Sequence, residues 1–157
     1  MATKAKDKVA IRGFARFQIV DAASGKAVTK KSKWYENTVV NLGFQDYVCG
    51  AIGAIGGSKQ VAFMAIGTGT APGAASTSLA GETGSRYATS NSCIASKTMQ
   101  STCQFLGADM ASTCTIQNVA LVNATATSAT ILSGTTYATS QWASNQNVNA
   151  TYQLRFS

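Results

Sequence analysis

A chain of 157 residues with 45% hydrophobic residues is long enough to bury the core of one domain. Charged residues make up only 12% of it, about half the usual share of a soluble domain. The sequence has no histidine, so acid–base catalysis would fall to carboxylates, Lys, Tyr or Cys, and none of its six acids are paired at a suggestive spacing. We therefore expect a protein that acts by binding and is not an enzyme.

The positive charge is concentrated at the start of the chain. Residues 1–33 hold nine basic side chains against Asp7 and Asp21, which equals the whole net charge of +7, while the charges of residues 34–157 cancel. A concentration of this kind indicates a basic surface next to an electrically quiet domain. We expect residues 1–8 to be a flexible basic arm and residues 9–157 to form a single β-sandwich domain.

The first predicted element is a strand over residues 9–20, in which apolar and polar side chains mostly alternate. A period of two places one face in the core, so Arg12 and Arg16 are expected on the opposite, exposed face. Residues 21–26 have the composition of a turn. Residues 28–34 are then predicted to return as a second strand and complete a hairpin.

One short helix is predicted over residues 42–55, where apolar side chains recur near helical spacing. Asn41 is the predicted N-cap, because its side chain can accept a bond from an otherwise unpaired helix N–H. Gly53, Gly56 and Gly57 are expected to end the helix. It should lie on the sheet edge or cover one end of the barrel.

Residues 61–72 form an apolar strand that runs into Gly67, Thr68 and Gly69 and then reaches Pro72, the only proline. A phosphate-binding loop would need its glycines to open a helix, or a lysine after them, and neither is present. The two glycines are therefore predicted to serve a turn, where they permit positive φ or close approach of the backbone.

The remaining chain reads as a series of short strands, of which the last alternates most cleanly. Short strands at regular spacing with little helix indicate an all-β sandwich or barrel. We expect a jelly-roll-like topology, with other Greek-key sandwiches left open. The predicted strands cover residues 84–94, 98–106, 115–122, 129–132 and 148–156.

The four cysteines, Cys49, Cys93, Cys103 and Cys114, include no Cys-x-x-Cys pair, so no metal site and no cofactor are predicted. No signal peptide and no stretch long enough to span a membrane are recognised, and we expect a chain made in a cytosol. Reduced thiols are expected there. A disulfide between two of Cys93, Cys103 and Cys114 on neighbouring strands is the alternative.

The segment IGTGT at residues 66–70, followed by Pro72 and by LAGE at residues 79–82, resembles a motif of small virion proteins of tailed bacteriophages. Residues 37–43 resemble the family's approach to a short helix, and residues 115–122 and the terminal strand resemble later family segments. The resemblance covers about residues 35–157 and leaves out the basic first part. Asn118 and Ala120 stand where the family usually has an acidic residue and a glycine.

This resemblance implies a bacteriophage virion structural protein, made in the host bacterial cytoplasm and located in the virion. The function expected first is that of a capsid decoration or cement protein, which binds the outer capsid surface and stabilises contacts between major capsid subunits. Its partners would be the major capsid protein and further copies of itself, as a dimer or trimer on a symmetry axis. The alternative is a tail, baseplate or fibre-attachment protein, possibly one that binds a receptor.

The candidate capsid-binding residues are the basic side chains beyond the arm. A basic surface could also attract nucleic acid or a membrane, but the sequence contains no known reading module and no membrane segment, so we expect neither as a partner. For a sugar or receptor, Trp142 is the candidate exposed aromatic; alternatively it fills a gap at the end of the sandwich. The predicted docking residues are Arg12, Arg16, Lys30, Lys31 and Lys33.

Overall fold

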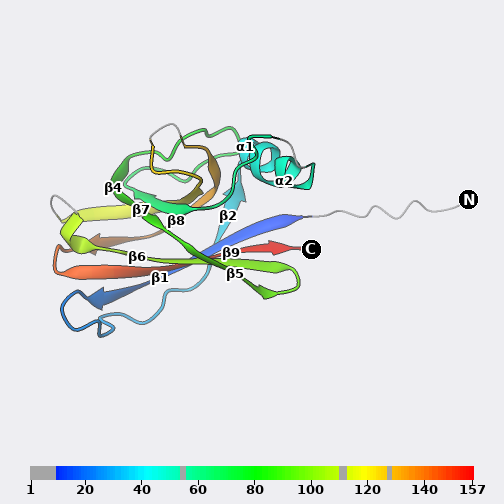
Figure 1. Ribbon diagram of the computed structural model, residues 1–157. Coiled ribbons are helices and arrows are strands. Elements are labelled where there is room, and N and C mark those ends of the chain that lie inside the picture. Colours follow the sequence, from blue (N-terminus) through cyan, green and yellow to red (C-terminus); the bar gives the residue numbers. More distant parts are fainter. Residues whose placement is uncertain (1–9, 54–55, 110–112, 127–128) are drawn as a thin grey trace, which may run out of the picture.

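The computed structural model describes residues 10–53, 56–109, 113–126 and 129–157, so the predicted arm, residues 1–8, lies outside the described residues. Nine strands make up most of the described chain, together with one helical segment in three pieces and a short 3-10 turn, η2 (Gly107–Asp109) (Figure 1). The strands are β1 (Ile11–Asp21), β2 (Tyr35–Val39), β3 (Phe63–Gly67), β4 (Glu82–Ala88), β5 (Ser90–Ala95), β6 (Thr98–Phe105), β7 (Cys114–Val122), β8 (Ile131–Trp142) and β9 (Gln146–Phe156).

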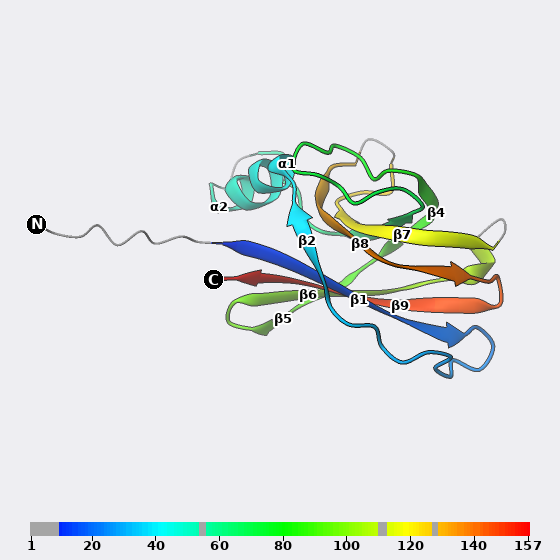
Figure 2. The same cartoon turned by 180° about the vertical axis from the view of Figure 1, so that it is seen from behind.

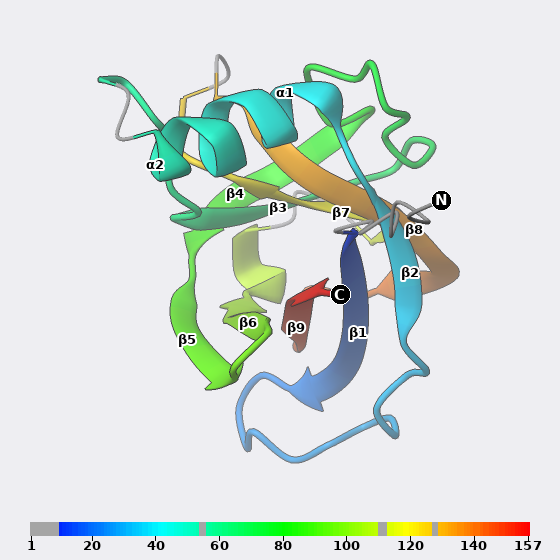
Figure 3. The ribbon, with the colours of Figure 1, turned by 90° about the vertical axis from the view of Figure 1, so that its right-hand side faces the viewer.

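The strands pair in the order β4-β3-β7-β8-β2-β1-β9-β6-β5, and all neighbours in this order are antiparallel. The two strands at the ends of this order, β4 and β5, follow one another in the chain with only Thr89 between them. The sheet therefore curls into a nearly closed ring, which Figure 3 shows from its end. This arrangement confirms the predicted all-β, sandwich-like fold with a short helix.

The ring is flattened into two sheets that enclose the core. The first sheet contains β1, β9, β6 and β5, the second contains β4, β3, β7 and β8, and β2 pairs with both β1 and β8 (Figure 2). The pairing is nested: β1 pairs with β9, β2 with β8, and β3 with β7. A long hairpin folded over in this way gives a sandwich- or barrel-like arrangement.

The side-chain pattern of each strand follows from what covers its two faces. In β9, Val148, Ala150, Tyr152 and Leu154 are buried between the sheets, as the alternation predicts. In β7 the run from Val119 to Val122 is buried without interruption. A second cluster on the outer side of the second sheet accounts for this run, because it covers Ala120 and Val122; its other members are Val40, Ala65, Leu79, Ala129 and Ile131.

The predicted helix exists, but its start and its regularity differ from the prediction. It comprises α1 (Asn41–Gly43), the π-helical η1 (Phe44–Cys49) and α2 (Gly50–Ile52), and it lies at the end of the molecule where β1 begins and β9 ends (Figure 1). The N-cap is Val40, which makes no side-chain capping bond. The predicted cap at Asn41 is wrong, because Asn41 is already helical and its backbone N–H donates to the carbonyl of Ala74.

The predicted return strand over residues 28–34 does not form. This segment runs along the edge of β1 as an irregular loop, and β2 begins only at Tyr35. Side-chain hydroxyls replace the missing ladder: the N–H of Phe17 donates to Ser32 Oγ and that of Ile19 to Thr29 Oγ1, each at 3.0 Å. Hydroxyl groups can compete with backbone carbonyls in this way, which explains why the loop stays irregular.

Candidate functional site

The outer face of the first sheet brings together three arginines from the two ends of the described chain. Arg12 and Arg16 point outward from β1, and β9 contributes Arg155, which lies directly opposite Arg12 in the strand register. The loop of residues 26–34 follows the edge of β1 next to this face. We call the outward cations of this region, Arg12, Arg16, Lys30, Lys31, Lys33 and Arg155, the basic face.

Aromatic rings hold the arginines in place. The guanidinium carbon of Arg16 lies 4.4 Å from the ring centre of Trp34. That of Arg155 lies 4.3 Å from the ring of Phe14 and 5.5 Å from Trp34. Such cation–π contacts are worth about 0.5–1 kcal/mol each at exposed sites. They offset the repulsion of like charges that face each other across two strands.

Amide side chains further orient Arg155. Its Nε and Nη2 donate to Gln153 Oε1 at 3.1 and 2.8 Å, and Gln153 Nε2 donates in turn to Gln100 Oε1 at 2.9 Å. The guanidinium of Arg155 is thus fixed by neutral groups only. It keeps its full charge available for an anion from outside.

Few carboxylates neutralise the basic face. The described residues form three ion pairs, of which only Arg12 with Glu36 belongs to this region. That pair spans 3.7 Å between side chains that are 63% and 59% exposed, so it contributes little to stability. Arg16 and Arg155 have no carboxylate within ion-pair distance in the described part of the chain, and the buried Nε of Arg16 has no hydrogen-bond partner there.

The loop lysines are accessible. Lys30, Lys31 and Lys33 are all exposed, and only Lys33 has an aromatic contact, 5.4 Å from the ring centre of Tyr35. Like Arg16, they have no carboxylate partner among the residues described. The structure thus places arginines that are held by aromatic rings beside exposed lysines of the same charge.

Sequence reasoning found five of these six cations and missed Arg155. Arg155 lies in the part of the sequence whose charges cancel, but it occupies the outward phase of the terminal strand. Its outward position in the alternating terminal strand, together with pairing of the first and last strands, would have predicted that Arg155 lies beside Arg12. The role of Trp34 was missed too, because the sequence placed it at the end of a predicted strand, whereas the structure has it in the loop before β2.

The predicted exposed aromatic is a core residue. Trp142 is only 2% exposed, and its ring meets Phe105 edge-on at a centroid distance of 6.2 Å. Its indole N–H donates to the carbonyl of Gln146, the first residue of β9. Trp142 therefore cannot bind a receptor from the surface; it fills the end of the sandwich, which was the alternative interpretation.

The IGTGT segment forms a turn, as predicted, and its glycines are needed for close packing. The N–H groups of Thr68 and Gly69 donate to the carbonyls of Gly81 and Ala80 at 2.9 and 3.1 Å. A Cβ on Gly69 would lie 2.6 Å from the carbonyl oxygen of Ala80, and neither Gly67 nor Gly69 has a positive φ. Close approach of the backbone therefore explains both glycines.

Asn118 closes this turn from the neighbouring strand β7. Its side chain is fully buried, and Nδ2 donates to the carbonyls of Thr70 and Ala80 at 2.8 and 2.9 Å. A carboxylate could not make these two bonds, because an ionised acid has no proton to donate. An asparagine, and not an acidic residue, therefore suits the bonds that this turn makes.

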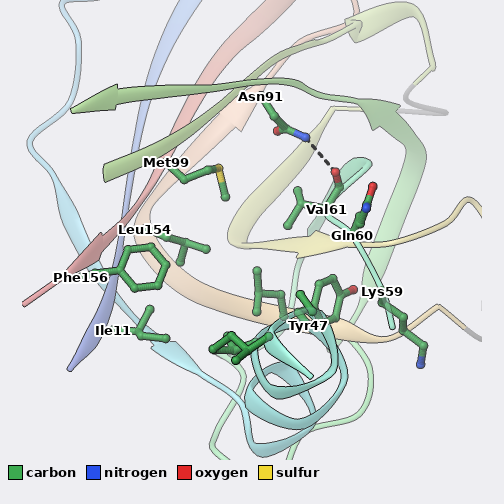
Figure 4. A pocket seen from close by; sticks show the side chains of 13 residues that line it. Ile11, Tyr47, Lys59, Gln60, Val61, Asn91, Met99, Leu154 and Phe156 are labelled. Carbon is green, nitrogen blue, oxygen red and sulfur yellow. Dashed lines mark hydrogen bonds between the residues drawn. The ribbon is translucent and has the colours of Figure 1, made fainter. Parts of the chain in front are cut away.

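A cavity of about 440 Å³ opens at the end of the barrel beside the helical segment (Figure 4). Three of its polar side chains already have partners: Asn91 Nδ2 donates to the carbonyl of Val61 at 2.8 Å, Lys59 pairs with Asp46, and Tyr47 donates to the carbonyl of Thr130. Gln60 is a further polar member of the wall, which is otherwise mostly apolar. Its apolar members are Ile11, Val48, Ala51, Ile52, Val61, Met99, Leu132, Leu154 and Phe156.

The cysteines are free thiols where their side chains are described. Cys49 and Cys93 are exposed, whereas burial raises the pKa of Cys103 to about 12. The side chain of Cys114 is outside the described part. Within that part, no three histidine, cysteine, aspartate or glutamate side chains are grouped to hold a metal ion. None of the helices formed by the described residues has the length and apolar character needed to cross a membrane.

Comparison with known proteins adds no assignment: no family model, no curated protein and no solved structure matches this chain.

Proposed function

We propose that this chain is a bacteriophage virion structural protein that decorates the capsid, with the basic face docking onto acidic surfaces of the major capsid protein. The virion role is proposed from the resemblance of the IGTGT segment and its neighbours to phage proteins. The docking surface is proposed from a single observation, the arginines and lysines that have no carboxylate partner among the described residues.

The arrangement of these cations favours binding over stability. A cation paired within its own chain gains little from a second carboxylate, whereas Arg16 and Arg155 are free of such a pair and already held by rings. Ordering these side chains in advance lowers the entropy that binding must remove. Guanidinium groups also present several N–H donors in a plane that matches a carboxylate.

An acidic protein surface fits this face better than a single nucleic-acid strand. Binding of single strands depends on bases that stack on free aromatic rings. Here the rings of Phe14, Trp34 and Tyr35 are already in contact with Arg155, Arg16 and Lys33. Carboxylates need only the outward N–H groups of the cations, and these remain available.

Repetition on a shell would make such modest contacts effective. Each exposed charge pair contributes little and is screened by salt. Several pairs held at neighbouring sites act together, because the first contact raises the effective concentration for the next. A decoration protein that binds in this way should leave its particle at high salt and return when the salt is removed.

The copy number per particle tests the virion role directly. We would measure this chain against the major capsid protein in purified particles of the phage that encodes it, by quantitative mass spectrometry with labelled peptide standards. A ratio within a few-fold of one supports a shell component. A ratio near one in a hundred would assign the chain to the tail, baseplate or fibre attachment, and absence from the particle would overturn the proposal.

A further inference from the structure

The strand order leaves two sheet ends, and they are protected differently. β4 carries two charged residues, Glu82 and Arg86, which pair with each other; the Arg86 guanidinium also donates to the carbonyl of Ala124 at 2.9 Å. Its pairing with β3 is irregular between Met64 and Ile66. Charges and register irregularities are the usual devices that prevent an edge strand from pairing with another chain.

β5 shares one of these protections, because its pairing with β6 shifts register between Cys93 and Ala95. It lacks the other, because its edge carries no charge. All six of its residues are exposed, and the sequence Ser-Asn-Ser-Cys-Ile-Ala contains no charge, proline or glycine. Its start is tied to the second sheet, since Asn91 Nδ2 donates to the carbonyl of Val61. For residues 92–95, the hydrogen bonds found in the described chain run only to β6. Ile94 is 50% exposed there.

We propose that residues 92–95 of β5 pair with the same residues of a second copy, antiparallel and about a two-fold axis. Strand addition to a free edge gains backbone hydrogen bonds without a large apolar surface. A two-fold contact places each residue against its own counterpart or a near neighbour of it. A charged edge would therefore repel itself, and β5 is neutral.

Charge also decides between this contact and others between two copies. The chain carries a net charge of +7, so contacts through the basic face are repulsive. In the strand order, β9 and β6 separate β1 from β5, which keeps this edge apart from most of the basic face. Pairing through β5 would continue the first sheet across both copies and would cover Ile94. Of the dimer and the trimer expected from the sequence, this contact gives the dimer, and it does not depend on the virion role.

Sedimentation velocity of the purified full chain, from micromolar to millimolar concentration, tests the contact. We expect a concentration-dependent dimer, and we expect Cys93→Lys to raise its dissociation constant by about tenfold or more, because like charges meet at the pairing edge. The matched control is Gln104→Lys, which adds the same charge to an exposed position of β6 within the same sheet. A chain that is monomeric at every concentration, or two variants with equal effects, would overturn the proposal.

A cross-linking experiment keeps the proposal testable if the lysine variant folds poorly. Cys93 and Cys49 are both exposed thiols, but only Cys93 lies on β5. In a Cys49→Ser background, a short bis-maleimide should capture the dimer through Cys93. In a Cys93→Ser background it should capture none. Equal capture in the two backgrounds would place the contact elsewhere and contradict the β5 edge.

Discussion

The turn beside β3 and the basic face of the first sheet differ in whether their polar side chains find partners inside the protein. Around the turn, Asn118 donates two hydrogen bonds inside the protein, and Arg86 is paired with Glu82 although its side chain is only 7% exposed. On the basic face, Arg16, Arg155 and the loop lysines are left without carboxylates. Polar groups of the first kind hold the fold together, whereas those of the second kind remain available to a partner.

The largest effect is expected from Asn118→Asp. The new carboxylate would be buried against the carbonyls of Thr70 and Ala80 and could donate no bond to them, which should cost about 3–5 kcal/mol of unfolding free energy. Urea denaturation measures this loss. Asn145→Asp, at an exposed position, is the control and should change stability by less than about 0.5 kcal/mol. Equal effects of the two substitutions would show that the turn does not depend on Asn118.

A matched pair of glycines tests the close packing of the same turn. A Cβ at Gly69 would meet the backbone of Ala80, whereas a Cβ at Gly73 would meet nothing within 4 Å. We expect Gly69→Ala to cost about 1–3 kcal/mol, the usual range for overpacking. Gly73→Ala should be neutral or slightly stabilising, because it restricts the unfolded chain. Thermal unfolding of both variants provides the comparison, and a stable Gly69→Ala protein would contradict the packing.

On the basic face, Trp34→Leu should weaken binding and barely change folding. Loss of the ring removes the contacts of Arg16 and Arg155, worth about 0.5–1 kcal/mol each at an exposed site. We therefore expect a several-fold weaker affinity for the acidic partner, with a urea midpoint close to that of the unmodified chain. Trp34→Phe should retain part of the affinity that Trp34→Leu loses, because it keeps an aromatic ring. A Trp34→Leu protein that unfolds at clearly lower urea concentration would show that Trp34 serves folding and not binding.

A loss of stability at alkaline pH is expected from groups that hold their protons tightly in the folded state. Burial raises the pKa of the Cys103 thiol from 9.0 to about 12, and burial together with the bond to Asp109 raises the pKa of Tyr87 from 10.0 to about 12. The folded state thus holds these protons more tightly than the unfolded state, so stability is full below about pH 9 and falls as the pH rises toward 12. Urea midpoints across this range measure the slope, which Cys103→Ala should reduce. A flat profile would contradict the burial of both groups.

Much of the fold could be predicted from the sequence, because several strands alternate or end in clear turn residues. The first strand, the strand before the IGTGT turn and the terminal strand follow this rule. The segment of residues 28–34 did not, since its hydroxyl groups bind the edge of β1 and replace the strand that the pattern suggested. The helix cap failed because the chain turns into the helix one residue earlier than the polar side chain of Asn41 indicates.

The candidate site was predicted in composition but not in arrangement. The basic residues of the first part of the chain are visible in the sequence, whereas Arg155 joins them only because the last strand pairs with the first. Trp142 shows the opposite error: its polar surroundings in the sequence suggested exposure, but the register of β8 directs it into the core. Both errors concern long-range pairing, which local patterns do not encode.

Rebinding to stripped particles tests the central claim, that the basic face docks onto an acidic capsid surface. Particles would be freed of this chain at high salt and mixed with the purified protein at low salt, and the bound fraction would be measured by co-sedimentation. We expect Lys30→Glu, Lys31→Glu and Lys33→Glu in combination to weaken rebinding by about tenfold or more. Lys31→Glu alone should weaken it more than Lys97→Glu, which reverses one exposed charge at the β5–β6 turn. Unchanged rebinding of the triple variant would contradict the account.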